Sequence, residues 1–421
     1  MANILDKNTS QLVLKKFVKG FMDDRVLLQT VNTQLIKDVL DPNTGSSVQL
    51  KRPHQYKAVR TPTGDMTGQA NNIVSATVTA NASEYITVNI NYQQFEQALQ
   101  LNQLDEILKP AHEEMTTELE RETAEFMINN AGLTNGTPGT AISQWGDVAV
   151  NGSYLTSLGA TGQSKNAAMN PFSTQELADT QSGLASGDNN LVNMAWREAQ
   201  ITTNFGGLKG FMSNSLGSYT TGTITGSGTV DATPTATYTA LKDTYQMTIA
   251  LAGFGAGATI VKGQQISFPA SLMLNQKNKN VIQGSGGAAI PFIGTVLADA
   301  VADGTGDITV TISGAAIIDA TNPQYNTVSK AITVADTVTV LAAASTTLQP
   351  GLFYTDEYVG VGTIDLPKLH GWDSSVLNVD GFSIRMTLYS DPVTSVQSVR
   401  FDLLPSFAVF NPMFGGQFFG Q

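Results

Sequence analysis

The sequence predicts an α+β protein in which an all-β domain is inserted into a host domain. Between residues 199 and 356 the chain has no Glu and no Arg, although both occur on either side. This stretch is instead rich in Thr and Val, which favour strands, and in Gly, which favours turns. At 421 residues the chain also exceeds the ~250–300 residues at which a single core stops growing. Two or more domains are therefore expected.

Residues 1–43 are expected to form an N-terminal arm. Ser10 is placed to cap a short helix through Leu12 and Phe17, and residues 30–39 carry a weaker helical pattern. Ordinary amphipathic packing helices are an equal alternative for both. Residues 1–60 hold ten Lys or Arg against five Asp, so this part of the chain is basic.

Residues 44–92 predict a long β-hairpin. A strong turn at residues 41–45 precedes it, Val48 and Leu50 alternate in an outgoing strand, and residues 61–65 form a tip rich in Pro and Gly. Residues 86–92 alternate as the return strand. Such an excursion has little core of its own, so we expect it to lie on another surface.

Residues 93–140 predict helix and the start of a further domain. Apolar residues recur every three or four positions from Phe95 to Leu108, and Pro110 is placed to begin a new helix that Gly132 ends. From residue 110 to 130 that helix would be about 31 Å long. Residues 93–131 hold nine acidic against two basic residues, so a basic partner is expected. The polar face of the helix carries Glu118, Glu120, Glu122 and Glu125.

The rest of the chain divides into four parts. Residues 141–217 are expected to be mixed α/β, with helices at 171–185 and 189–199, and residues 346–380 return to the same domain. Residues 218–345 form the inserted domain, a small closed barrel or sandwich. Its strands are expected at residues 245–251, 265–268, 292–297, 307–313, 331–334 and 337–341. Residues 381–421 supply strands at 382–389 and 398–404, joined around Asp391 and Pro392, and an aromatic tail.

Composition excludes several classes of protein. The net charge of −12 disfavours a sequence-reading nucleic-acid binder. The chain has no Cys, which removes disulfides, thiolate nucleophiles and thiolate zinc sites. Residues 1–18 lack the apolar core of a signal peptide, and the most apolar run, residues 249–261, is too short to span a membrane. We therefore expect a soluble protein made in a cytoplasm.

Motifs for catalysis or cofactor binding are not found. His54, His112 and His370 each stand alone in the sequence, so no zinc spacing arises. There is no phosphate loop and no nucleophile turn, and the glycines at 253, 255 and 257 lack the dinucleotide context. Asp299, Asp303 and Asp307 could bind calcium weakly, but a solubilising acidic turn is the better interpretation. We predict no catalytic residues, no cofactor and no metal, and hence no enzyme.

The order of parts resembles the major coat protein of tailed bacteriophages, the Hong Kong 97-type capsid fold. The inserted barrel is similar to that of the short-tailed phages of the Salmonella and Shigella type. Segments that carry the resemblance run from end to end: Leu14-Lys15-Lys16-Phe17, Lys51-Arg52-Pro53-His54-Gln55, Arg60-Thr61-Pro62-Thr63-Gly64-Asp65, Asn204-Phe205-Gly206-Gly207, Asn322-Pro323-Gln324-Tyr325-Asn326, Leu366-Pro367-Lys368-Leu369-His370, Phe401-Asp402-Leu403-Leu404-Pro405 and Gly415-Gly416-Gln417-Phe418-Phe419-Gly420.

The resemblance implies parts and partners. The parts would be an N-arm, an E-loop at residues 44–92, a spine helix, and peripheral and axial domains. The chain would form pentamers and hexamers of an icosahedral virion shell, assembled in the host cytoplasm on a scaffolding protein. The shell would expand as double-stranded DNA enters through a portal protein, with no membrane and no sequence-specific DNA binding. Some relatives crosslink through a Lys that Lys57 would match, but the barrel-bearing branch is not known for this.

The candidate functional residues are therefore charges at contacts between subunits. The hairpin charges are expected to meet the acidic helix of a neighbouring copy, and charges in the barrel loops are expected to meet other subunits. Simple solubilisation is the alternative for each barrel residue. The candidates are Lys51, Arg52, Lys57 and Arg60 on the hairpin, Glu118, Glu122 and Glu125 on the helix, and Lys242, Asp243, Asp303 and Asp307 in the barrel.

A rival class is a secreted adhesin or surface-layer protein. Acidic, cysteine-free chains rich in Thr, Gly and Asn occur in that class. It requires an export signal, which residues 1–18 do not supply. The sequence therefore favours the shell protein.

Overall fold

The computed structural model describes residues 6–32, 47–67, 71–82, 84–91, 104–182, 204–370, 373–391 and 396–421. The chain forms two compact units. Unit 1 comprises Met1–Leu50, Thr79–Ala124 and Gly360–Ala408, and unit 2 comprises Lys51–Val78, Glu125–Val359 and Val409–Gln421. Each unit is thus assembled from segments that lie far apart in the sequence.

Unit 1 contains a four-stranded antiparallel sheet in the order β20-β21-β22-β3. The register places Met386 opposite Phe401 and Phe401 opposite Val88. Alternate residues of the two central strands therefore form one apolar face. The strands are β20 (Asp373–Val379), β21 (Phe382–Asp391), β22 (Val396–Leu403) and β3 (Ile86–Asn91).

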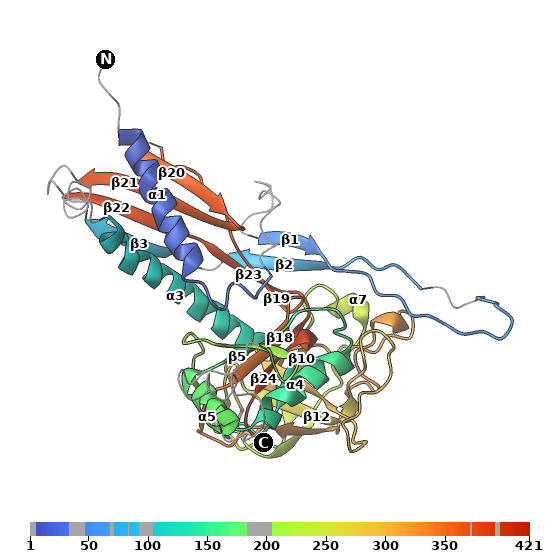
Figure 1. Ribbon diagram of the computed structural model, residues 1–421. Helices are drawn as coiled ribbons and strands as arrows, with labels where there is room; N and C mark the ends of the chain where they lie inside the picture. Colours follow the sequence, from blue (N-terminus) through green and yellow to red (C-terminus); the bar gives the residue numbers. More distant parts are fainter. Residues whose placement is uncertain are drawn as a thin grey trace. The chain divides into compact units, whose positions relative to one another are not determined.

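Helix α1 (Asp6–Asp23) lies along this sheet, as Figure 1 shows. Phe17 stacks on Phe401 with ring centroids 3.9 Å apart, and Phe21 meets Phe382 edge to face at 5.7 Å. Both helix residues are fully buried. The helix begins before Ser10, so the expectation that Ser10 is its N-cap was wrong, and Ser10 lies inside the helix.

Helix α3 (Leu104–Asn130) is one continuous helix of 27 residues with Pro110 inside it. The prediction that Pro110 begins a new helix was therefore wrong. A proline in the second turn removes one intrahelical hydrogen bond, and the long helix continues beyond it. Buried Met115, Leu119 and Met127 form its apolar face.

A second four-stranded sheet has the order β1-β2-β23-β19. The predicted return strand of the hairpin was misplaced, because it is β2 that pairs with β1. The alternating segment at residues 86–91 is a strand, β3, but it pairs with β22. The strands of this sheet are β1 (Ser47–Lys51), β2 (Thr77–Ala82), β23 (Pro405–Val409) and β19 (Val359–Thr363).

Unit 2 contains a six-stranded sheet in the order β4-β24-β18-β5-β7-β6. Helices α4 (Trp145–Leu158) and α5 (Pro171–Ser182) belong to the same unit. Phe353 and Phe418 pack edge to face in its core, with ring centroids 6.2 Å apart. The strands are β4 (Leu133–Asn135), β5 (Lys165–Met169), β6 (Asn204–Phe205), β7 (Leu208–Met212), β18 (Gly351–Thr355) and β24 (Gly415–Phe418).

The inserted region forms a closed barrel in the order β10-β15-β13-β12-β16-β9. Met247, Ile249 and Leu251 are buried on alternate positions of β10, as a period of two requires. Of the predicted strands, only residues 331–334 are not a strand, because they lie in a turn region, and β9 was missed. The strands are β9 (Ser227–Val230), β10 (Gln246–Ala252), β12 (Gln265–Leu272), β13 (Pro291–Val296), β15 (Ile308–Ser313) and β16 (Thr337–Val340).

Short elements complete unit 2. Strands β8 (Tyr219–Thr220) and β17 (Thr347–Leu348) pair at the base of the insertion. Strands β11 (Thr259–Ile260) and β14 (Ala300–Val301) form a small ribbon. The remaining elements lie in loops: helix α7 (Tyr238–Leu241) and the 3-10 turns η2 (Pro323–Tyr325) and η3 (Pro412–Phe414).

Several predicted elements lie outside the described residues. They are the turn at 41–45, the helix at 189–199, most of the helix at 30–39, and the helical segment before residue 104. The turn after Asp391 is likewise not described. These expectations stay predictions.

Candidate functional site

The segment Lys51–Val78, here called the excursion, runs out from β1 and back to β2 as two extended arms (Figure 1). Among its described residues only Arg52, Ala76 and Val78 are buried. Its large apolar side chains are open to solvent instead. The excursion therefore has almost no core of its own. The exposed fractions are 59% for Tyr56, 48% for Met66 and 67% for Ile73.

Arg52, which was expected to meet the acidic helix of a neighbouring copy, contacts residues of its own chain. It is only 7% exposed, and its guanidinium stands 4.2 Å from the centre of the Tyr245 ring. It donates to the carbonyls of Phe410 and of Asp243, the latter at 3.2 Å. Burial lowers the pKa of Arg52, and the nearby Tyr245 partly offsets this. Arg52 is thus used within its own chain.

The other candidate cations of the excursion are open to solvent. Lys51, Lys57 and Arg60 are all exposed. The side chain of Asn71 bridges the two arms: its Oδ1 accepts from the Lys57 backbone N–H and its Nδ2 donates to the Lys57 carbonyl, both at 3.0 Å. The backbone at Lys57 is therefore held, while its side chain is open to a partner.

The acidic candidates of α3 are partly engaged within the chain. Glu118 accepts from Arg121, and that hydrogen bond lowers the pKa of Glu118. Glu125 pairs with Lys262 at 2.5 Å, and Glu122 is half-buried. The acidic face is therefore less negative than the sequence alone indicates.

Glu120 was placed on the outer face of the helix, and this was wrong. Its side chain is buried, and Oε1 accepts the backbone N–H groups of Val26, Leu27 and Leu28 at 2.5, 2.8 and 3.4 Å. A carboxylate that receives consecutive amides holds the segment that follows α1. Glu120 is therefore a structural residue of unit 1.

The first pair of barrel candidates faces the excursion of its own chain. Lys242 pairs with Asp243 at 2.8 Å, and Asp243 also accepts from the Thr77 N–H at 2.8 Å. Burial tends to raise the pKa of Asp243, but the bonds from Lys242 and Thr77 outweigh it, so this pKa is lowered. Both residues are thus engaged within unit 2.

The second pair lies in the loop that carries Asp303 and Asp307. Oδ1 of Asp303 accepts the N–H groups of Thr305 and Asp307 at 2.8 and 3.0 Å, which closes a tight turn. The hydrogen bonds from Thr305 and the backbone lower the pKa of Asp303. Within the described ranges, no group of three or more His, Cys, Asp or Glu residues is placed to hold a metal ion.

The three histidines have different surroundings. His54 and His370 are exposed. His112 lies against Phe17, and its Nδ1 is 2.5 Å from the carboxylate of Asp24, an interaction within unit 1. Over the part of the chain that the structure describes, no helix is both long enough and apolar enough to cross a membrane.

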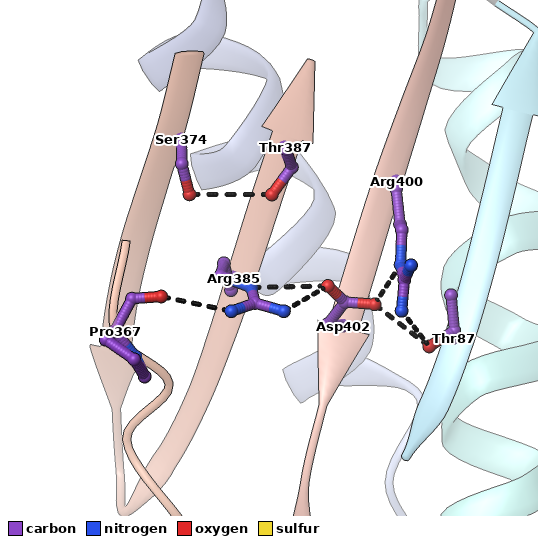
Figure 2. A network of polar contacts seen from close by, with 7 residues as sticks. All are labelled: Thr87, Pro367, Ser374, Arg385, Thr387, Arg400 and Asp402. Carbon is purple, nitrogen blue, oxygen red and sulfur yellow. Dashed lines mark hydrogen bonds and ion pairs between the residues drawn. The ribbon is translucent and has the colours of Figure 1, made fainter. Parts of the chain in front are cut away.

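A buried charge network in unit 1 was not predicted (Figure 2). Oδ2 of the fully buried Asp402 accepts from Arg385 at 2.8 and 3.2 Å. Oδ1 accepts from Arg400 at 2.5 Å and from Thr87 at 2.9 Å. Arg385 also donates to the carbonyl of Pro367 at 3.0 Å. The available signal was Arg400 and Asp402 two residues apart on a predicted strand, which places both on one face.

Comparison with known sequences shows what kind of protein has this fold. The family model described as "P22 coat protein - gene protein 5" matches residues 1–420. A major capsid protein of Acyrthosiphon pisum secondary endosymbiont phage 1 is 46% identical over 424 residues, covering 100% of both chains. The chain is thus a major capsid protein of a phage, a structural protein and not an enzyme. Within that class it belongs to the P22 coat protein family.

Solved structures give more distant likenesses. A chain of Mycobacterium phage Che8 is 11% identical with a TM-score of 0.41, covering 92% of this chain and 90% of that one. The capsid structure of the cyanophage P-SCSP1u is 10% identical with a TM-score of 0.39, covering 93% and 88%. The family assignment rests on the sequence matches. As a phage capsid protein, the chain is part of the virion and assembles with many copies of itself.

Proposed function

We propose that the chain builds an icosahedral precursor shell of pentamers and hexamers with a Hong Kong 97-type fold. In this proposal a scaffolding protein directs assembly in the host cytoplasm, and the shell expands as double-stranded DNA enters through a portal protein. The DNA is enclosed without sequence-specific binding. Family membership supports this proposal and disfavours the rival interpretation as a secreted adhesin or surface-layer protein.

The observation that carries the proposal is the excursion. Its exposed Tyr56, Met66 and Ile73 gain stability only when another surface covers them. We propose that this surface belongs to a neighbouring copy. The exposed cations of the excursion then lie near the acidic face of the neighbour's α3. The charges proposed to meet are Lys51, Lys57 and Arg60 on one copy, and Glu118, Glu122 and Glu125 on the other.

Contacts of this kind act mainly on register and on the reversibility of assembly. Exposed ion pairs contribute about 0.2–1 kcal/mol each. Repetition over many copies makes such weak contacts sufficient, because each subunit is held at several places at once. Asp303 and Asp307 are proposed as further contact charges, whereas Arg52, Lys242 and Asp243 are engaged within the chain.

The first prediction tests the excursion contact. The double variant Lys57→Glu with Arg60→Glu reverses two exposed charges without changing a buried group. We expect few or malformed shells when this variant is expressed with a scaffolding protein. The thermal midpoint of the unassembled chain should not fall, because Lys57→Glu removes a charge that disfavours protonated Lys279. Electron microscopy and sedimentation measure the shells, and circular dichroism measures the fold.

A matched control is Lys209→Glu with Lys368→Glu, which reverses two exposed lysines outside the excursion. If pairing with α3 is the cause, adding Glu118→Lys to the excursion variant restores part of the shell yield. Normal shells from the excursion variant, or equal damage from the control, would contradict the proposed contact.

A further inference from the structure

Two segments that lie far apart in the sequence meet in unit 2. One is the start of the excursion at residues 51–55, and the other is the turn at residues 322–326, which contains η2. Lys279 joins them, because its Nζ donates to Oε1 of Gln55 and to the carbonyl of Asn326, each at 3.1 Å. The turn has a rigid support, since its aromatic ring stacks on another buried ring at 3.7 Å. These two rings are Tyr325 and Tyr238.

Asp243 holds both arms of the excursion. Its carbonyl accepts from Arg52 of the outgoing arm at 3.2 Å, and its carboxylate accepts from Thr77 of the returning arm at 2.8 Å. The Arg52 guanidinium also lies over the Tyr245 ring. Asp243, which lies shortly before β10, thereby constrains both arms close to β1 and β2.

The returning arm has a second attachment further out. Nε2 of Gln324 donates to the carbonyl of Asn72 at 2.9 Å, and Nδ2 of Asn72 donates to the carbonyl of Thr321 at 3.2 Å. Gln324 is only 1% exposed with the arm in place, so the donor amide of this hydrogen bond is shielded from water. We use the term latch for the contacts of Arg52, Gln55, Asn72 and Thr77 with the inserted region.

We infer that the inserted barrel domain positions the excursion of its own chain through the latch, before that excursion meets a neighbouring copy. The latch thus binds the excursion of the same chain. Arg52 is the main positioning residue of the latch. This inference rests on the proposed function of the excursion as a contact between subunits. It assigns the insertion a role inside each subunit.

The physical gain is preorganisation. An excursion without a core samples many directions, and a neighbour that binds it must offset the lost conformational entropy. Polar contacts at both arms remove part of that freedom in the unassembled chain. Assembly is then faster when the latch is closed.

The absence of cysteine from the sequence allows a direct test in the unassembled chain. The pair Asn72→Cys with Thr321→Cys places two thiols at the latch. It removes the hydrogen bond from Asn72 Nδ2 to the Thr321 carbonyl and keeps the one from Gln324 to the Asn72 carbonyl. The control pair Met66→Cys with Thr321→Cys keeps one thiol and moves the other toward the exposed tip. Under mild oxidation we expect the latch pair to form its disulfide at least about tenfold faster, which corresponds to about 1.4 kcal/mol. Equal rates would overturn the latch.

A second comparison assigns the role of Arg52. We expect Arg52→Met to remove most of the rate advantage of the latch pair, and Arg60→Met, the same change at an exposed site, to leave it. Amide exchange of β10 shows whether the barrel stays folded. If the Arg52→Met chain stays folded and the latch pair still forms its disulfide about tenfold faster than the control pair, Arg52 is not the main positioning residue.

If Arg52→Met unfolds the barrel, a milder variant decides the question. Gln55→Ala with Asn72→Ala removes two latch side chains that are not buried, and proteolysis of the excursion is measured instead of disulfide formation. Faster cleavage than in the parent supports the latch, and unchanged cleavage overturns it.

The last measurement separates this inference from the proposed function. Chains locked by the latch disulfide are mixed with a scaffolding protein, and shell formation is followed with and without a reducing agent. Locked chains that assemble at the parental rate or faster support positioning by a closed latch. Locked chains that assemble only after reduction would overturn it, because the latch would then have to open. The disulfide rates themselves do not depend on whether the excursion binds a neighbour.

Discussion

At the scale of single residues, Asp402 shows how a buried charge is satisfied in unit 1. Its carboxylate is fully buried, and both oxygens accept hydrogen bonds, from Arg385 on one side and from Arg400 and Thr87 on the other (Figure 2). Arg385 is itself buried, whereas the side chain of Arg400 is 42% exposed. The two arginines therefore contribute unequally, because only Arg400 has access to solvent.

This difference predicts unequal effects of two substitutions. Asp402→Ala leaves Arg385 buried without its counter-charge, and we expect the free energy of unfolding to fall by about 3–5 kcal/mol. Arg400→Ala leaves the Arg385–Asp402 pair intact and should cost about 0–1 kcal/mol. Urea unfolding of the unassembled chain, followed by circular dichroism, measures both. Similar small losses for the two variants would show that the buried pair is not a main support of the sheet.

Lys279 is a second residue whose charge is partly removed from water. Burial, and then the nearby charge of Lys57, lower its pKa from 10.5 to about 8. The folded chain therefore releases this proton at lower pH than the unfolded chain does. Between about pH 8 and 10.5 the unfolded state binds more protons, so this group makes the free energy of unfolding rise with pH in that window. Below about pH 8 the cost of burying the charge is fully present.

The prediction is a difference in slope between two proteins. Relative to Lys279→Met, the free energy of unfolding of the parent should rise by up to about 1.4 kcal/mol per pH unit above pH ~8. The variant also lacks the hydrogen bonds from Lys279 to Gln55 and Asn326. Their loss lowers its free energy of unfolding by the same amount at every pH, so it does not change the difference in slope. Denaturant titrations at several pH values measure it, and contributions from the buried tyrosines cancel in the comparison. If the free energies of unfolding of the parent and of Lys279→Met change in parallel with pH, folding does not lower the pKa of Lys279.

At the scale of elements, periodicity predicted strands better than their partners. The alternation at residues 86–91 correctly indicated a strand, but β3 pairs with β22, which lies far along the chain. Alternation within a strand does not show which other strand it pairs with. The prediction paired residues 86–91 with β1 because β1 is the nearest strand in the sequence. Five of the six barrel strands were predicted from their Thr- and Val-rich composition and the turns between them, whereas β9 was missed and residues 331–334 are not a strand.

Glu120 shows why polar residues on a helix are harder to place. It lies three or four residues from buried Thr116, Thr123 and Ala124, so the helical period itself puts it on the inner face. The many glutamates of α3 instead suggested one solvated acidic face. The sequence does not reveal that the N–H groups of residues 26–28 need an acceptor, and that need is what makes a buried carboxylate favourable.

Among the candidate contact residues, the environment of some could be predicted from the sequence and that of others could not. Exposure of Lys57 and Arg60 could be predicted, since they lie next to a polar tip. Burial of Arg52 could not, because its partners Asp243 and Tyr245 belong to a domain that begins much later in the sequence. Charge alone cannot separate a cation that meets a neighbouring subunit from one that meets a distant part of its own chain.

At the scale of the whole molecule, the inserted barrel is bonded to the rest of unit 2 by buried polar side chains. Three barrel side chains donate to backbone carbonyls at the end of α3, just after it and in β4. The barrel therefore completes the hydrogen bonding of its host. The pairs are Ser313 with Asn130 at 2.9 Å, Gln265 with Leu133 at 3.0 Å, and Thr295 with Ala131.

The base of the insertion also allows a clean deletion. The N–H of Thr221 donates to the carbonyl of Thr346 at 2.9 Å, so the two ends of the insertion lie side by side. Removing residues 222–345 and joining Thr221 to Thr346 with a short Gly/Ser linker keeps the pairing of β8 with β17. The deletion therefore tests the barrel itself and not a strained connection.

We expect the deleted chain to be insoluble or to form misassembled particles. The host surface that the barrel covers would then face water, and the carbonyls at residues 130, 131 and 133 would lose their side-chain donors. The matched milder variant, Gln265→Leu with Thr295→Val, keeps the barrel but removes two of these donors, and it should lower the thermal midpoint while still yielding shells. Solubility, calorimetry and electron microscopy with a scaffolding protein measure these outcomes. Clean shells from the deleted chain would show that the host folds and assembles without its insertion.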